Sequence, residues 1–78
     1  SEAETGLDAE QVVFQAGRSV ALRELKERGL KSVVFAVARG SERYYYPSDG
    51  FELKPGDVLI LMGLREDLDR DVAILSRV

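Results

Sequence analysis

Apolar residues occur along the chain in short runs that differ in their spacing. The two strongest, VVFAVA at 33–38 and VLILM at 58–62, are unbroken and rich in β-branched or large aliphatic residues, which is typical of strands. Because neither run has a polar face, we expect both strands to be covered on both sides. Shorter runs predict further strands at 10–16 and 42–46.

Apolar residues with helical spacing follow the predicted strand at 10–16. Leu22 and Leu25 lie three residues apart and predict one apolar face. Ser19 is placed to cap the first turn with its hydroxyl, and Gly29 stands where a left-handed residue often ends a helix. These signals together predict a helix in the segment 20–29.

The segment REDLDRDVAIL at 65–75 predicts a second helix. Residues spaced four, four and three apart form an apolar stripe that we expect to lie on the sheet: Leu64, Leu68, Val72 and Leu75. Its acidic part, at 66–71, has the composition of a cation site, but a calcium loop needs an irregular segment with a central glycine. A solvated helix face is therefore the preferred interpretation.

The elements follow one another in the order β-α-β-β-β-α. A strand, a helix and a buried strand in succession predict a βαβ unit, with the strands at 10–16 and 33–38 parallel and a right-handed crossover. We therefore predict an α+β fold of two layers with a mixed sheet. The polar, acidic residues 1–9 are expected to form a linker or tether, and residues 10–78 the domain.

A sharp turn precedes the last strand. Pro55 and Gly56 fit the second and third positions of a type II turn, because Gly tolerates the positive φ required there. Asp57 then has two interpretations. It is either a catalytic carboxylate or, as we prefer, an acceptor for backbone N–H groups of the turn.

The run RYYY at 43–46 also has two interpretations. In a strand, Tyr44 and Tyr46 face one way and Tyr45 faces the other. The tyrosines then either form a stacking platform for a nucleobase or pack one face on the core while the other covers an edge or a partner subunit. We prefer packing, because a tyrosine ring is apolar and its hydroxyl is polar.

Length and composition limit the classes of function. A chain of 78 residues forms one small domain that hides only about 60% of its unfolded surface, so a second copy of the chain is an expected aid to stability. The chain has no cysteine and no histidine. Disulfides, nucleophilic triads and thiolate or imidazole metal sites are therefore excluded, and we expect neither an enzyme nor a metal site.

The charge distribution favours a small ligand over a nucleic acid polymer. Fourteen Asp and Glu residues outnumber eleven Lys and Arg residues, whereas a nucleic-acid surface normally has a basic excess. The basic residues gather between Arg18 and Arg43, where Arg28, Lys31 and Arg39 are candidates to hold a phosphate or remain an ordinary basic surface. No apolar run reaches the roughly 20 residues that cross a bilayer, so we expect a soluble domain.

Four segments in this order resemble the TrkA-C family, the C-terminal lobe of RCK regulators of potassium channels and transporters. They are GRSVALREL at 17–25, VVFAVARGSERYYYP at 33–47, LKPGDVLILMG at 53–63 and REDLDRDVAIL at 65–75. The resemblance implies a β-α-β-β-β-α lobe that forms a homodimer. It also implies a place on the cytoplasmic side of the membrane, fused or bound to a potassium channel, a potassium transporter or another cation carrier.

The same resemblance implies a ligand site. Some branches of the family bind cyclic di-AMP at the dimer interface. Arg28 corresponds to an arginine that contacts the phosphates, Pro47 to a proline beside the base, and Leu30 and Val33 to apolar residues of the pocket. With Lys31, these form the predicted ligand site. The alternative is a dimerisation or scaffolding lobe of a secondary transporter or antiporter without a ligand, which the shortened segment after the first helix favours.

Overall fold

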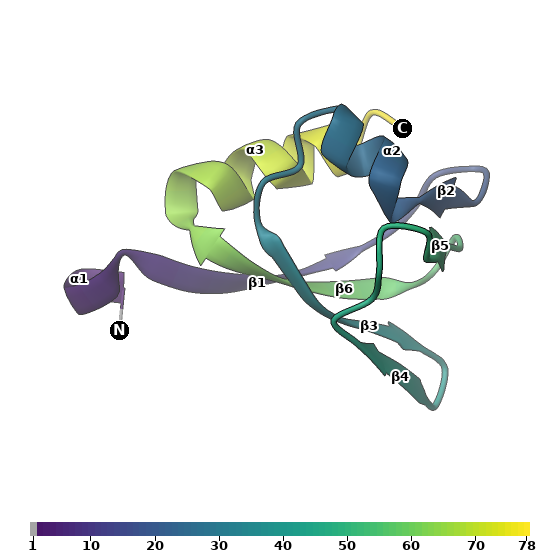
Figure 1. Ribbon diagram of the computed structural model, residues 1–78, viewed down its shortest axis with the longest axis horizontal. Coiled ribbons are helices and arrows are strands. Elements are labelled where there is room, and N and C mark those ends of the chain that lie inside the picture. The colour runs from purple at the N-terminus through teal and green to yellow at the C-terminus, as the bar shows by residue number, and fades with distance from the viewer. Residues whose placement is uncertain (1) are drawn as a thin grey trace.

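The computed structural model describes residues 2–78, which form two layers (Figure 1). A four-stranded sheet has the order β1-β6-β3-β4, with β1 at Leu7–Val13, β3 at Val33–Arg39, β4 at Glu42–Tyr45 and β6 at Val58–Leu64. Helices α2 (Leu22–Glu27) and α3 (Arg65–Leu75) lie on the same side of this sheet. The predicted α+β class and the order of the main elements are confirmed.

Three short elements complete the chain. Helix α1 (Glu2–Thr5) precedes β1, and β2 (Val20–Ala21) pairs with β5 (Glu52–Leu53) in a separate antiparallel ladder beside α2. No helix within residues 2–78 combines the length and the apolar character needed to span a membrane.

The sheet differs from the prediction in how its strands pair. β6 is antiparallel to both β1 and β3, so β1 and β3 run in the same direction, as expected. β6 lies between them, however, and every ladder is antiparallel. The two parallel strands of the predicted βαβ unit are therefore not neighbours, because the last strand, an apolar run of full length, takes the place between them.

The first strand begins earlier than predicted. β1 starts at Leu7 rather than at residue 10, and Leu7 pairs with Leu64. Leu7 and Ala9 continue the two-residue alternation of a strand, so residues 7–9 belong to the sheet rather than to the predicted linker. Residue 1 of that linker lies outside the described residues, and the division into tether and domain otherwise stays a prediction.

Helix α2 begins without the predicted cap. Its N-cap residue is Ala21, and Ser19 lies two residues before it. The backbone N–H groups of Leu22 and Arg23 donate to carbonyl oxygens of the 49–51 segment at 2.9 and 2.8 Å, so acceptors distant in sequence replace the side-chain cap. Gly29 has a φ of 108° and ends the helix as predicted.

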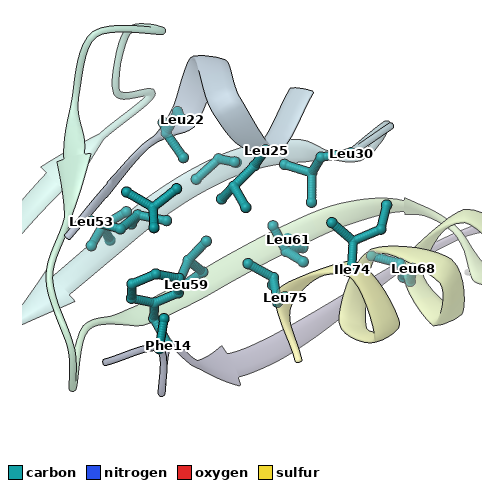
Figure 2. Close-up of a cluster of buried hydrophobic side chains, with 14 residues drawn as sticks. Phe14, Leu22, Leu25, Leu30, Leu53, Leu59, Leu61, Leu68, Ile74 and Leu75 are labelled. Carbon is teal, nitrogen blue, oxygen red and sulfur yellow. The ribbon is translucent and has the colours of Figure 1, made fainter. Parts of the chain in front are cut away.

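The core lies between the helices and one face of the sheet (Figure 2). Phe14, Leu25, Leu59, Leu61 and Leu68 are completely buried there. Each such side chain contributes roughly 1.5–3 kcal/mol relative to an exposed position. These contacts hold both helices on the sheet.

The buried side of α3 is rotated relative to the predicted stripe. Leu68 and Leu75 are buried, but Leu64 and Val72 are 42% and 37% exposed, and the buried set is instead Leu68, Asp71, Ile74 and Leu75. The rotation places the Asp71 carboxylate against the backbone at the start of β3, where it accepts hydrogen bonds.

The two apolar strands are covered on one face only. In β6, Leu59 and Leu61 are completely buried under the helices, Ile60 is half-buried and Met62 is 43% exposed. Val33, at the start of β3, is 55% exposed. The expectation of coverage on both sides is therefore wrong for the single chain, because α2 and α3 lie on the same side of the sheet.

Candidate functional site

A cleft of about 350 Å³ opens between α2, the start of β3 and the segment that follows β4. Its lining residues come from these three places: Leu22, Lys26, Leu30, Lys31, Ser32, Val33, Val34, Tyr46 and Pro47. Four of the predicted ligand-site residues, Leu30, Lys31, Val33 and Pro47, are thus brought together. Arg28 is not among the lining residues.

The cleft has an apolar floor and a more exposed rim. Leu22, Leu30 and Val34 are buried members of the core. Val33 is 55% exposed and Tyr46 is 66% exposed, so both present apolar surface at the rim. Such a surface, with a few polar groups around it, is typical of sites for small organic ligands.

Two lysines bring positive charge to the cleft. The Lys26 ammonium pairs with Asp49, whereas the Lys31 ammonium has no ion-pair partner within the described part of the chain. Arg28 follows α2, and its guanidinium pairs with Glu24 one turn earlier, with a distance of 3.1 Å from Nη2 to Oε2. Lys31 is therefore the basic side chain most available to an anion in the cleft.

The backbone just before β3, which lines the cleft, is held to α3 by a buried carboxylate. Asp71 is 1% exposed and accepts hydrogen bonds from the backbone N–H groups of Lys31 at 3.0 Å and Ser32 at 2.9 Å. Charge-assisted bonds of this kind are stronger than neutral ones. Sequence reasoning missed this contact, because Asp71 belongs to an acidic segment that was interpreted as a solvated helix face.

Ser32 packs closely on the sheet at Gly63. Its hydroxyl oxygen is buried and has no hydrogen-bond partner among the described residues. A Cβ atom added to Gly63 would come within 2.8 Å of this oxygen. The glycine therefore leaves the space that the serine occupies between β3 and β6.

Tyr46 reaches the cleft through an unusual backbone conformation. β4 ends at Tyr45, and Tyr46 has a φ of 47°, which is uncommon for a residue other than glycine. Its ring lies 5.2 Å from Phe35, whereas Tyr44 packs on Phe51 at 5.1 Å on the core side. The predicted shared face of Tyr44 and Tyr46 is wrong, because the left-handed residue breaks the alternation.

Asp57 is confirmed as a structural acceptor. Its carboxylate accepts a hydrogen bond from the Lys54 N–H at 2.8 Å in the predicted turn, where Gly56 has a φ of 93°. Arg39 donates two further bonds to it, from Nε at 2.8 Å and Nη2 at 2.7 Å. The Arg39 guanidinium holds the pKa of the Asp57 carboxyl below its usual value. Arg39 is thereby engaged away from the cleft.

Acidic side chains of α3 form ion pairs with arginines rather than a site for a metal ion. Asp67 pairs with Arg70, and Asp69 pairs with Arg65, which also contacts Asp8 and Glu10 of β1. No group of acidic side chains suited to a metal ion occurs among the described residues.

Comparison with known proteins identifies the class. The TrkA-C domain family matches residues 10–75 of this chain, which therefore belongs to that family. A solved structure that is similar in fold is described as the RCK C domain of the potassium transport protein KtrA in complex with cyclic diadenosine monophosphate (cyclic di-AMP). The TM-score is 0.76 at 22% sequence identity, over 92% of this chain and 87% of that chain. No curated protein matches this chain.

Proposed function

We propose that this chain is a cytoplasmic regulatory domain of a potassium or other cation channel or transporter, which it joins as a fused domain or a bound subunit. In this proposal it forms a homodimer and senses a small anionic ligand. The observation that carries the proposal is the cleft, in which the Leu30–Val34 segment and Pro47 combine an apolar floor with free positive charge. Membership of the TrkA-C family supports it.

The ligand is proposed to be a cyclic dinucleotide such as cyclic di-AMP. The KtrA domain with a similar fold is described in complex with that molecule. The cleft lies near the lower end of the range of ligand pockets, about 300–1,000 Å³, so it suits one nucleotide half better than a whole dinucleotide. A ligand with two equal halves then suits a dimer that presents two such clefts.

The cleft residues have distinct proposed roles. The Lys31 ammonium pairs with a phosphate, while Val33, Tyr46 and Pro47 provide apolar surface for a base. Leu30 forms the floor. Arg28 remains a proposed phosphate contact, although its guanidinium first has to leave Glu24 to make that contact.

In this proposal, the cleft is connected to α3 by hydrogen bonds, so ligand binding also affects the position of α3. Asp71 of α3 holds the backbone of Lys31 and Ser32, which are residues of the cleft. A ligand that prefers one position of this segment therefore also favours one position of α3. It shifts the equilibrium between two states only by the difference in its affinity for them.

A second candidate is a dimerisation lobe that binds no ligand. The ion pairs of Lys26 with Asp49 and of Arg28 with Glu24 favour it, because they neutralise two of the basic side chains near the cleft. In that case Lys31 is an ordinary surface lysine.

Thermal unfolding with and without cyclic di-AMP separates the two candidates. A ligand that binds only the folded state, at a hundred times its Kd, adds about 2.7 kcal/mol. For a domain of this size that corresponds to a rise in Tm of roughly 10–20 °C. An unchanged Tm at about millimolar ligand contradicts the sensing function and leaves the ligand-free lobe.

Matched lysine variants test whether the ligand binds in the cleft. Lys31→Ala is expected to weaken binding about tenfold or more, because one charge-assisted contact is lost. Lys54→Ala removes an exposed lysine outside the cleft and is expected to bind like the wild type. Arg28→Ala tests the arginine separately. Equal affinities for Lys31→Ala and the wild type would exclude the proposed phosphate contact.

A further inference from the structure

The lining of the cleft includes two ammonium groups, and a carboxylate from outside the lining pairs with one of them. Lys26 and Lys31 are the charged residues among those that line the cleft. The Lys31 ammonium has no ion-pair partner within the described part of the chain, whereas the Lys26 ammonium donates a hydrogen bond to the Asp49 carboxylate at 2.5 Å. Asp49 thus offsets one of the two positive charges, and a ligand in the cleft meets one free ammonium.

Backbone hydrogen bonds hold Asp49 beside Lys26. Asp49 belongs to the connection between β4 and β5, which passes the first turn of α2 (Figure 1). The Asp49 carbonyl oxygen accepts a hydrogen bond from the Arg23 N–H at 2.8 Å, and the Phe51 carbonyl oxygen accepts one from the Leu22 N–H at 2.9 Å. Lys26 follows one helical turn later on the same side of α2. The carboxylate is therefore in place before a ligand arrives.

The ion pair changes the charge of the cleft more than it changes the stability of the fold. The Lys26 ammonium holds the pKa of the Asp49 carboxyl below its usual value, and the charge of Arg23 adds to this effect, so the carboxylate is ionised at neutral pH. The side chains of Lys26 and Asp49 are 48% and 53% exposed. An exposed pair of this kind changes an equilibrium constant by about fivefold at most.

One free ammonium suits one class of phosphate better than another. A phosphodiester carries one negative charge, whereas a terminal phosphate carries a charge of about −1.5 to −2 at pH 7. The additional charge of a terminal phosphate lacks a free cation in the lining and is repelled by the Asp49 carboxylate. A cyclic dinucleotide contains only phosphodiesters. When water cleaves one of its P–O ester bonds, the ring opens to a linear dinucleotide with a terminal phosphate and a free hydroxyl group.

We propose that Asp49 is a specificity-determining residue, which makes the cleft favour a phosphodiester over a terminal phosphate by occupying the Lys26 ammonium. This proposal rests on the ligand sensing of the proposed function and deepens it. With Asp49 in place, the domain distinguishes a cyclic dinucleotide from the linear product of the hydrolysis reaction that removes it. Specificity of this kind is a difference between two affinities, so it is measured as a ratio of dissociation constants.

Calorimetric titrations of the 78-residue chain with cyclic di-AMP and with its linear hydrolysis product measure this ratio, the Kd of the linear form divided by that of the cyclic form. Asp49→Asn is expected to lower the ratio about fivefold, because the terminal phosphate gains most from the freed Lys26 ammonium. The Lys26→Met/Asp49→Asn double variant is expected to return the ratio to the wild-type value, because it removes both charges. In about 0.5 M salt the effect of Asp49→Asn is expected to shrink, because exposed charges are screened.

Asp67→Asn is the matched control. It makes the same change of charge and frees Arg70 of α3 from its ion pair, outside the lining of the cleft, so the ratio is expected to stay at the wild-type value. An equal ratio for Asp49→Asn and the wild type, in chains that bind cyclic di-AMP, overturns the proposal and leaves the sensing function intact. An equal fall in Asp67→Asn also overturns it. If neither dinucleotide binds the wild type or Asp49→Asn, the sensing function and the proposal fail together.

The ion pair itself is measured without a ligand. In a ¹³C NMR titration, the pKa of the Asp49 carboxyl is expected to rise toward its usual value in Lys26→Met, because the ammonium that favours the charged form is lost. An unchanged pKa would show that Lys26 is free in solution, which overturns the proposal whether or not a dinucleotide binds.

Discussion

Replacing Arg39 with alanine removes one half of an ion pair whose other half is deeply buried. Asp57 is 1% exposed, and Arg39 donates two of the three hydrogen bonds found at its carboxylate, at 2.8 and 2.7 Å. The guanidinium also lies 5.3 Å from the ring centre of Tyr44 and 5.4 Å from that of Phe51. The variant thus leaves a buried carboxylate with the Lys54 N–H alone.

The structure sets the size of the effect. Removing one partner of a buried pair costs about 3–5 kcal/mol. The Arg39 side chain is 28% exposed, so water reaches the site and the lower value, about 3 kcal/mol, applies. For a chain of this length the loss corresponds to a fall in Tm of roughly 12–24 °C. It is also a large fraction of the roughly 4–12 kcal/mol that stabilises 78 residues.

Urea unfolding at pH 7, followed by circular dichroism, measures this loss. Arg43→Ala is the matched control, because Arg43 bonds carbonyl oxygens of its own exposed hairpin, and its cost is expected to stay within about 0.5 kcal/mol. A double-mutant cycle with Asp57→Ala isolates the coupling between the two side chains. If Arg39→Ala costs no more than Arg43→Ala, the reasoning about the buried pair is refuted.

Three further predictions concern stability. The pKa of Asp57 is lower in the folded protein than its unfolded value of about 4, so the carboxylate adds stability above about pH 4, and this stability is lost as the pH falls through the folded pKa. Urea midpoints should therefore decline between pH 7 and pH 2. A flat profile of midpoints would contradict this prediction. Asp71→Asn should cost about 1–3 kcal/mol in the same assay, because an amide offers one acceptor oxygen to two backbone donors; an unchanged midpoint would contradict this. Gly63→Ala should cost about 1–3 kcal/mol by crowding Ser32, whereas Gly17→Ala meets no atom within 4 Å and should be nearly neutral; equal midpoints would show that the sheet yields to the added methyl group.

Local patterns predicted the elements well and their assembly less well. The helix at 65–75 has the observed bounds, because its charged and apolar residues follow a helical period from end to end. The sequence does not predict the order of the strands in the sheet, because the place of β6 between β1 and β3 depends on contacts between residues far apart in sequence. The buried role of Asp71 depends on such a contact as well.

The candidate site was likewise predicted in part. Leu30, Lys31, Val33 and Pro47 were predicted from the residues and the family resemblance, and they line one cleft. Lys26 was not among the predicted site residues, and Tyr46 belongs to the tyrosine run that was interpreted as packing rather than as a stacking platform. Tyr46 enters the cleft only because its backbone is left-handed, and no sequence rule predicts that conformation for a tyrosine.

The most direct test of the sensing function is an NMR titration of the ¹⁵N-labelled chain with cyclic di-AMP. The account predicts saturable shifts confined to the backbone amides of residues 30–34 and 46, with smaller changes in α3 near Asp71. The absence of shifts at about millimolar ligand, or shifts confined to residues outside the cleft, would contradict the sensing function.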